Sequence, residues 1–209
     1  MPYPARRIIT LTLLGITLSG ISILIIDQPL SQYFRQPELL PLWLKARAIT
    51  NIGLGDPYFT IAILIYIFAK WIRPQLTKWR EFGRDFFFSL LGSGFLIHLI
   101  KFSFGRQRPH LSEDLNPLIF TPFTTDWNFH SFASGHTQVL FTVATMMSLT
   151  LPRWSWLYFL LATALGLTRV IIHDHFLSDF IGGAVVGYVG TITSVYFVHR
   201  WQLRSSKQN

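Results

Sequence analysis

Cysteine is absent from all 209 residues of this sequence. That absence excludes a disulfide framework, a thiolate metal site and a catalytic cysteine. Charge is also scarce, since Asp, Glu, Lys and Arg make up 13% of the chain, about half of the roughly 25% found in soluble domains. The ten acidic residues do not cluster, so the sequence offers no obvious ligands for a two-metal site. Low-complexity tracts and internal repeats are missing too, and we expect one domain over residues 1–209.

Apolar residues dominate what is present. Hydrophobic residues account for 50% of the chain and aromatic residues for 16%, which is typical of membrane proteins, whose Trp and Tyr gather at the membrane interfaces. The formal net charge of +8 would suit nucleic acid or an anionic surface. The basic residues are scattered between apolar runs and form no stripe. The sequence therefore favours a membrane and an anionic substrate over nucleic acid.

Six apolar runs predict an all-α polytopic membrane protein with six transmembrane helices in a bundle, at about residues 8–26, 58–72, 86–100, 137–151, 154–172 and 176–198. Several runs are shorter than the roughly 20 residues that span a bilayer, but helix ends in the interface or local thinning can cover the difference. The first run follows Arg6 and Arg7 and has no Ala-x-Ala cleavage site after it. It is therefore interpreted as an uncleaved anchor rather than a signal peptide.

The distribution of basic residues predicts the orientation of these helices. Eleven lie on the side of the N-terminus, namely Arg6, Arg7, Lys70, Arg73, Lys78, Arg80, Arg84, Arg153, Arg200, Arg204 and Lys207. Seven lie on the other side, namely Arg35, Lys45, Arg47, Lys101, Arg106, Arg108 and Arg169. We therefore expect both termini in the cytoplasm and the chain in the cytoplasmic, or inner, membrane.

Two long connections remain between the runs. Residues 27–57 place several leucines and Trp43 among prolines and charges, so they suit either an interfacial amphipathic segment or a packed extracellular loop. Residues 105–132 carry His110, Asp126 and His130, which are candidates for contact with a substrate head group. A connection of this length usually has a function, and an active-site cover is the common one.

Three polar clusters interrupt the apolar chain, and all fall on the predicted outer, periplasmic face. The first runs from Lys101 to Arg108-Pro109, the second is Ser134-Gly135-His136, and the third combines Arg169, His175 and Asp179. His175 and Asp179 are four residues apart and can share a helix face. A carboxylate on one imidazole nitrogen fixes the tautomer and leaves the other nitrogen as a nucleophile or base. The alternative is a structural pair that caps the start of a helix.

The other two clusters also have two interpretations each. Ser134 and Gly135 precede an apolar run, where free backbone N–H groups and a glycine form an anion cradle, but Ser134 can equally be a helix N-cap. The cations of the clusters suit phosphate oxygens, or else they extend to the membrane surface as ordinary flanking residues. Arg106 is assigned only that second, ordinary role.

Taken together, Lys-x6-Arg-Pro, Ser-Gly-His and Arg-x5-His-x3-Asp are specific in order and spacing. The set resembles the three-part signature of the type-2 phosphatidic acid phosphatase superfamily, which includes lipid phosphate phosphatases, bacterial acid phosphatases and vanadium haloperoxidases. The resemblance covers Lys101 to Asp179. Two positions depart from it, because Ala133 replaces the usual proline and Thr168 the usual serine.

The resemblance implies a role for each residue. His175 would be the nucleophile that forms a phosphohistidine, Asp179 would orient it, and His136 would be the general acid on the leaving group. The phosphate would be held by Lys101, Arg108, Ser134, Gly135 and Arg169. These cations fill the electrostatic role of a metal, so a hydrolase without metal or other cofactor is expected.

Neighbouring histidines are assigned elsewhere. His173 and Asp174 adjoin the nucleophile, but metal binding there is disfavoured because no further ligands accompany them. His98, inside a predicted span, is interpreted as a hydrogen-bonded core residue.

A site level with the membrane surface is most easily reached by a phosphate already anchored in lipid. We therefore expect a phosphatase of lipid phosphates or diphosphates, with undecaprenyl diphosphate first, because that is a common role of short six-span members of the family. Lipid A, phosphatidylglycerol phosphate and phosphatidic acid are the alternatives. Phosphotransfer to a lipid acceptor, or a lipid-binding or translocating protein with a relict site, also stays open. Membrane lipids are the expected surroundings, and no obligatory protein partner is inferred.

Overall fold

The computed structural model describes residues 5–205, which form helices and contain no β-strand. The α-helices are α1 Ala5–Ile21, α2 Asp27–Phe34, α3 Leu40–Ile49, α4 Gly55–Ile67, α5 Thr77–Phe104, α6 Gly135–Thr150, α7 Ser155–Ile171 and α8 Leu177–Ser205. Two π-helical turns, Ser22–Ile26 and Phe68–Ile72, follow α1 and α4 without a break. Short 3₁₀ turns occupy Pro37–Leu39, Thr50–Gly53, Pro109–Leu111, Trp127–Phe129 and Pro152–Trp154. The all-α prediction is confirmed.

Five helical segments of the described chain are long and apolar enough to cross a membrane: Ala5–Phe34, Pro37–Ile72, Thr77–Phe104, Pro152–Ile171 and Leu177–Arg204. Each contains one of the predicted runs. The remaining run forms α6, which has 16 residues and is too short to count by length. The membrane character of the protein is thus confirmed, while the predicted number of six spans is not.

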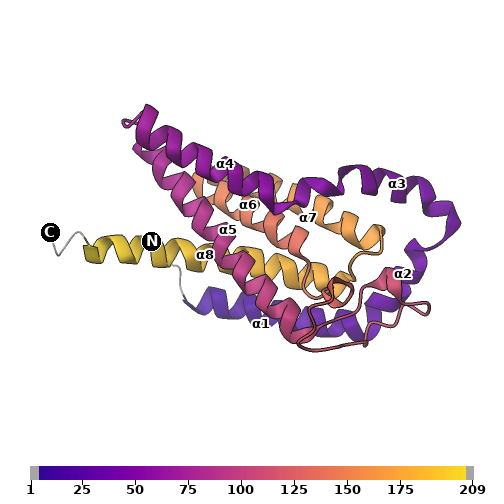
Figure 1. Ribbon diagram of the computed structural model, residues 1–209. Coiled ribbons are helices and arrows are strands. Elements are labelled where there is room, and N and C mark those ends of the chain that lie inside the picture. Colours follow the sequence, from indigo (N-terminus) through magenta and orange to yellow (C-terminus); the bar gives the residue numbers. More distant parts are fainter. Residues whose placement is uncertain (1–4, 206–209) are drawn as a thin grey trace.

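Helix α6 lies in the middle of the bundle and contacts α5, α7 and α8, and α8 also packs on α5 and α1 (Figure 1). Buried polar side chains of α6 form hydrogen bonds with α5. Gln138 Nε2 of α6 donates to Ser93 Oγ of α5 (2.7 Å), and this oxygen lies 3.1 Å from Thr142 Oγ1 of α6. Close approach to α8 depends on small residues there. A Cβ on Gly183 or Gly187 would collide with a backbone oxygen of α6 or its cap. Helix α6 is therefore enclosed by its neighbours although it has only 16 residues.

The helices alternate in direction, so the polar clusters gather at one end of the bundle. The start of α1, the α4–α5 and α6–α7 connections and the end of α8 lie at one end (Figure 1). The end of α5, the start of α6 and the α7–α8 connection lie at the other. Large apolar side chains cover the outside of the helices, where Leu24, Trp71, Phe95 and Trp201 are each at least 70% exposed. Such a surface is stable facing lipid and would be a liability in water.

The segment 27–57, for which an interfacial amphipathic segment and a packed loop were the two alternatives, is mostly helical. The first predicted span, at about residues 8–26, ends just before the charged side chain of Asp27. This side chain is fully buried and accepts hydrogen bonds from Ser22 Oγ (2.8 Å) and the Ser178 N–H (2.9 Å). The helix can therefore continue through α2 to Phe34. After a turn, α3 packs against α7 with Leu40 and Leu44 exposed, and its place at a membrane interface stays a prediction.

The segment 105–132 is irregular but well tied to the site end of the bundle. Gly105 ends α5 with a φ of +58°, and a Cβ there would collide with the Thr121 carbonyl, so only glycine fits. Thr121 N–H in turn donates to Gly105 O (2.7 Å), and Ser131 N–H donates to Arg106 O (2.9 Å). These bonds return the chain from α5 to the start of α6 and fix the first two polar clusters side by side.

Candidate active site

The three polar clusters meet around one cavity of about 330 Å³. Six of the eight predicted site residues line it: Lys101, Arg108, Gly135, His136, Arg169 and His175. The other two, Ser134 and Asp179, are completely buried behind this lining. Residues separated by most of the second half of the chain therefore share one site, as their common membrane end predicts.

His175 and Asp179 form a buried pair. His175 lies in the turn between α7 and α8, and Asp179 lies in the first turn of α8. His175 Nδ1 is 3.5 Å from Asp179 Oδ2, which also accepts hydrogen bonds from Ser131 Oγ (2.5 Å) and the Phe176 N–H (2.8 Å). Since Nδ1 faces the carboxylate, Nε2 is the nitrogen available to a reacting group in the cavity.

Burial controls the protonation of His175. Removal from water lowers the pKa of His175 well below its usual value, and the nearby Lys101 and Arg108 lower it further, against the opposing effect of Asp179. The imidazole is therefore neutral at pH 7. A neutral imidazole with one nitrogen oriented by a carboxylate is the form that can attack a phosphorus atom.

The start of α6 supplies the second side of the cavity. The first-turn N–H groups of Gly135 and His136 have no acceptor within the helix and carry the positive end of its dipole. His136 Nε2 is buried and has no hydrogen-bond partner within residues 5–205. A buried polar atom without a partner is rare, and a bound group in the cavity would satisfy it.

Ser134 acts as the N-cap, the simpler of its two predicted roles. Its hydroxyl accepts from the Thr137 N–H (3.4 Å) and from Thr137 Oγ1 (3.0 Å), and its own N–H donates to the Asp179 carbonyl (2.9 Å). Its side chain does not line the cavity, and its predicted contact with phosphate stays a prediction. Ser134 ties the α6 cradle to the helix that carries Asp179.

Three cations converge on the cavity from different elements. Lys101 Nζ, at the end of α5, donates to the carbonyls of His130 (2.5 Å) and Ser131 (3.5 Å). Arg108 Nε donates to Trp127 O (3.2 Å). Carbonyl partners orient these groups without cancelling their charge, so an anion is needed to balance them.

Arg169, at the end of α7, is the third cation. It pairs with Asp174 (NH2 to Oδ2, 2.5 Å) and donates to Thr50 Oγ1 (3.3 Å). Its Nε is buried without a hydrogen-bond partner in the described part of the chain. Asp56 also lines the cavity, so three cations face one lining carboxylate.

The remaining wall of the cavity is apolar. Phe59 comes from α4, Leu90 and Ile97 come from α5, and Trp127 comes from the segment 105–132. His98 also lines this wall, with its ring 6.2 Å from that of Trp127, so its assignment to the protein core is wrong. The site is amphipathic, with cations at one side and hydrocarbon-like side chains at the other.

The other histidines of this region have structural contacts. His110 Nδ1 lies 3.4 Å from Asp174, His130 Nε2 lies 2.9 Å from the Thr124 carbonyl, and Asp126 caps the turn at Asn128. None of these three head-group candidates lines the cavity, whereas Trp127 does. His173 Nε2 lies 3.1 Å from Ser31 O, and burial lowers the pKa of His173.

Arg106, predicted to be an ordinary flanking cation, is wrongly assigned by sequence. It is completely buried, and its guanidinium bridges Asp179 Oδ1 (2.6 Å) and Asp27 Oδ2 (2.8 Å). The signal that could have identified it is Asp27, a carboxylate at the end of an apolar run, which needs a cation if it is buried. Arg106 lies within the first polar cluster, whereas Asp27 lies outside all three.

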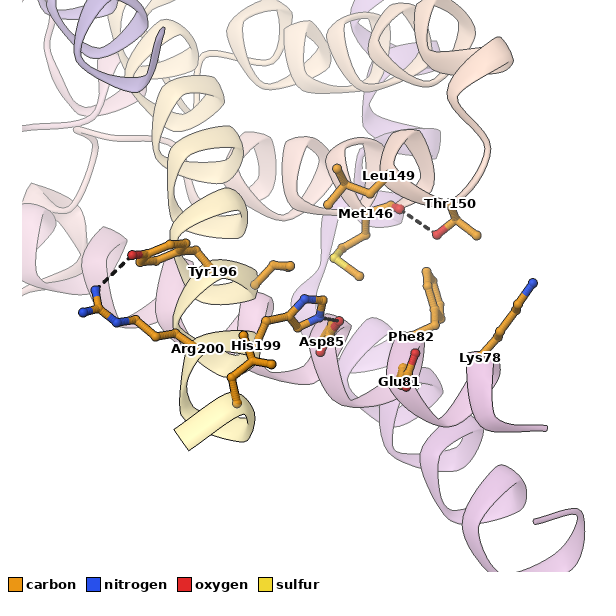
Figure 2. Close-up of a pocket in the computed structure, with 12 residues that line it drawn as sticks. Lys78, Glu81, Phe82, Asp85, Met146, Leu149, Thr150, Tyr196, His199 and Arg200 are labelled. Carbon is orange, nitrogen blue, oxygen red and sulfur yellow. Dashed lines mark hydrogen bonds and ion pairs between the residues drawn. The ribbon is translucent and has the colours of Figure 1, made fainter. Parts of the chain in front are cut away.

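A larger cavity, of about 530 Å³, also contains a His–Asp pair, at the other end of α5, α6 and α8 (Figure 2). His199 Nε2 lies 2.8 Å from Asp85, but Asp85 also binds Arg84 (2.7 Å), and Arg200 is engaged by Tyr196 (3.0 Å). Helix α6 ends here, so its last carbonyl groups point towards this cavity. None of the eight predicted site residues lines this cavity, whereas six of them line the smaller one.

The model of the PAP2 superfamily matches residues 82–203, more than half of the chain and all three polar clusters. The chain belongs to the PAP2 superfamily. It is similar to PAP2-type relatives along most of its length. A lipid A 1-phosphatase of Rhizobium etli is 29% identical over 190 residues, covering 85% of this chain and 80% of the relative. A lipid A 1-phosphatase of Rhizobium johnstonii is 28% identical over 198 residues, covering 88% and 79%.

Two crystal structures share the fold. Aquifex aeolicus LpxE has a TM-score of 0.59 and 26% identity, covering 82% of this chain and 95% of that one. The first transmembrane PAP2 type phosphatidylglycerolphosphate phosphatase from Bacillus subtilis has a TM-score of 0.53 and 21% identity, covering 92% and 96%. At 21% identity, the similarity to the second structure supports the fold and nothing further. Together the comparisons confirm the family resemblance and the phosphatase class, and this PAP2 member is a membrane lipid phosphatase. They give no support to undecaprenyl diphosphate as its substrate.

Proposed function

We propose that this PAP2 phosphatase hydrolyses the 1-phosphate of lipid A through a phosphohistidine on His175. The observation that carries the proposal is the cavity itself. A neutral, carboxylate-oriented imidazole faces two buried nitrogens without partners, His136 Nε2 and Arg169 Nε, beside an apolar wall. A phosphate monoester on an acylated sugar has the matching chemistry, an anion joined to hydrocarbon.

The first step forms the phosphoenzyme. His175 Nε2 attacks phosphorus, and the bond between phosphorus and the sugar oxygen breaks. Burial and the nearby Arg169, Arg108 and Lys101 lower the pKa of His136 to about 3 in the free site, and the bound phosphate dianion opposes this shift. His136, at the other side of the cavity, then donates a proton to the leaving oxygen. Lys101, Arg108 and Arg169 neutralise the charge on the transferring phosphoryl group, together with the first-turn N–H groups of α6.

The second step regenerates the enzyme. Water enters the space left by the dephosphorylated lipid and attacks the phosphohistidine, while His136 accepts a proton from that water. The bond between phosphorus and Nε2 breaks, and inorganic phosphate leaves. The mechanism assigns no step to a metal ion or cofactor, because the cations and the helix terminus supply the positive charge.

The choice of lipid A rests on two supports. Two relatives that bear this activity in their names resemble the chain over 85% and 88% of its length, well beyond the polar clusters. A cavity of about 330 Å³ is at the small end for ligand sites. It suits a phosphate and part of a sugar, with acyl chains remaining between α4, α5 and the surrounding lipid.

The orientation proposed from sequence is kept. The bundle end opposite the cavity carries Lys70, Arg73, Lys78, Arg80, Arg84, Arg153, Arg200 and Arg204, the larger share of the flanking basic residues. By the positive-inside rule this end faces the cytoplasm. We therefore place the cavity on the periplasmic face of the inner membrane, where lipid A phosphate groups in the outer leaflet would reach it.

A substrate panel tests the proposal. Purified enzyme in detergent would receive lipid A phosphorylated only at position 1, lipid A phosphorylated only at position 4′, undecaprenyl diphosphate, phosphatidylglycerol phosphate and phosphatidic acid. We expect fastest release of inorganic phosphate from the 1-phosphate, and a loss of roughly 10⁴-fold or more in His175→Ala. Faster release from another lipid would overturn the choice of lipid A. Transfer of phosphate to a second lipid, seen by mass spectrometry in place of free phosphate, would overturn hydrolysis.

A further inference from the structure

Behind the His175–Asp179 pair lies a completely buried charge network, made of Arg106, Asp27, Ser178 and Asp179 and called here the Arg106 network. Each of the four residues is 0% exposed. The guanidinium donates from NH1 to Asp179 Oδ1 (2.6 Å) and Ser178 Oγ (2.6 Å), and from NH2 to Asp27 Oδ2 (2.8 Å). Its Nε donates to Pro117 O (2.9 Å), and the group stacks 4.3 Å from the Phe176 ring.

This network divides the two oxygens of the Asp179 carboxylate between different tasks. Oδ1 is held by Arg106, while Oδ2 accepts from Ser131 Oγ and the Phe176 N–H and faces His175 Nδ1. The carboxylate cannot rotate without breaking the short bond to Arg106. The orientation of the nucleophile therefore depends on a residue that does not itself line the cavity.

Asp27 completes the charge balance from a distant part of the chain. It lies 79 residues before Arg106 and 151 before Ser178, in the helical segment that begins the described chain. Its Oδ1 accepts from the Ser178 N–H (2.9 Å) and Ser22 Oγ (2.8 Å), and its Oδ2 accepts from Ser178 Oγ (2.5 Å) as well as Arg106. Asp27 also lies outside residues 82–203, the part matched by the PAP2 superfamily.

One buried cation between two buried carboxylates carries a high desolvation cost. Removing the cation would leave two carboxylates with neither water nor a counter-ion, and a broken buried pair is strongly unfavourable. Such a network is hard to justify by stability alone, because apolar replacements of buried ion pairs are often at least as stable. Because the network contacts Asp179, it can also fix the orientation of that carboxylate.

We propose that Arg106 is a positioning residue for phosphoryl transfer, and that Asp27 of the first helical segment holds Arg106 in place for that role. The inference rests on the proposed function of His175 as nucleophile. Arg106 touches neither the substrate nor the reacting atoms. It acts through Asp179, by keeping Oδ2 directed at His175.

Three variants separate positioning from a purely structural role. Arg106→Gln leaves two carboxylates without their cation, so we expect less folded protein and a kcat about 10- to 100-fold lower, with KM little changed. Asp27→Asn keeps Arg106 beside Asp179 but weakens its anchor, so we expect a kcat about 3- to 10-fold lower, a smaller loss than in Arg106→Gln, and an unchanged kcat would overturn the role of Asp27. The double variant Arg106→Gln/Asp27→Asn removes one charge of each sign, so folding should recover while kcat stays low.

The double variant decides the matter. A structural role predicts that kcat per folded molecule returns to the wild-type value together with thermal stability, and this result would overturn the inference while leaving the function of His175 intact. Arg84→Gln is the matched control, because it breaks another ion pair, Arg84–Asp85, at the far end of the bundle and should leave kcat unchanged. Absence of phosphate release by the wild-type enzyme from every lipid of the panel would instead refute the proposed function, and the inference with it.

Discussion

At the scale of single residues, the chemistry depends on how the protein sets the charge of His175. Because burial lowers its pKa well below about 6.5, the imidazole is neutral over the whole neutral range. We expect no loss of kcat/KM as the pH falls through 6.5, and a loss only when the pH passes the lowered pKa and the nucleophile becomes protonated. A pH–rate profile of the free enzyme measures this limb. An acidic limb centred near 6.5 would contradict the assignment.

The same shift affects stability. In the unfolded chain His175 recovers its usual pKa, so below about pH 6.5 the unfolded state binds more protons than the folded state. The contribution of this residue to the free energy of unfolding is therefore present above that pH and is lost as the pH falls.

Arg169 provides a second test at this scale. A lysine keeps the charge but loses Nε and the forked geometry that can hold two phosphate oxygens. We expect Arg169→Lys to lower kcat by about 10²-fold. Arg47 also approaches Asp174, at 3.9 Å, but its side chain is 58% exposed, so Arg47→Lys should leave phosphate release unchanged. Equal losses in the two variants would show that only the pairing with Asp174 matters.

Some of the site residues could be predicted from the sequence, and others could not. The members of each polar cluster lie within ten residues of one another, so the order and spacing of the three clusters together indicate a phosphate site. Arg106 and Asp27 could not be assigned in this way, because each looks like a helix-end charge until the fold brings them together. The N-cap role of Ser134 is seen in its hydrogen bonds with Thr137, while its contact with phosphate stays a prediction.

At the scale of helices, the site depends on how closely α8 packs against α6. A Cβ on Gly187 would overlap Gln138 O and press on Phe141, whereas a Cβ on Gly20, in α1, would meet nothing within 4 Å. We expect Gly187→Ala to destabilise the protein by about 1–3 kcal/mol and to reduce phosphate release, since it separates His136 from His175. Gly20→Ala should be neutral or slightly stabilising. Thermal unfolding in detergent measures both, and equal melting temperatures would contradict this packing argument.

The observed helix boundaries agree with the predicted apolar runs, except where a buried charged residue is neutralised by a residue of another segment. Five runs became segments long enough to span a membrane, but charge at Asp27 ended the first prediction too early. A sequence pattern counts a charge as a boundary, whereas a helix continues through it when a cation of another segment neutralises it. The residues from Asp27 onwards therefore form α2 and α3, and of the two predicted alternatives the packed loop is the one that the structure does not show.

At the scale of the whole molecule, the orientation in the membrane can be tested by labelling single introduced cysteines. The natural sequence has no cysteine, so an introduced one is the only thiol that can react. A single cysteine at Glu113, exposed at the cavity end, should react with a membrane-impermeant maleimide in intact spheroplasts. A single cysteine at Gln75, exposed in the α4–α5 connection, should react only after permeabilisation. The reverse pattern would overturn the periplasmic position of the site.

The Arg106 network has a consequence for how the chain enters the membrane during synthesis. Asp27 and Arg106 are both made before α8, and an unpaired charge left in a bilayer is costly. Their direct bond allows each to neutralise the other while the last helix is still missing, at a stage when Ser178 and Asp179 have not yet been translated. The final insertion of α8 then brings Asp179 onto a cation already in place, so that hydrolytic competence begins only when the chain is complete.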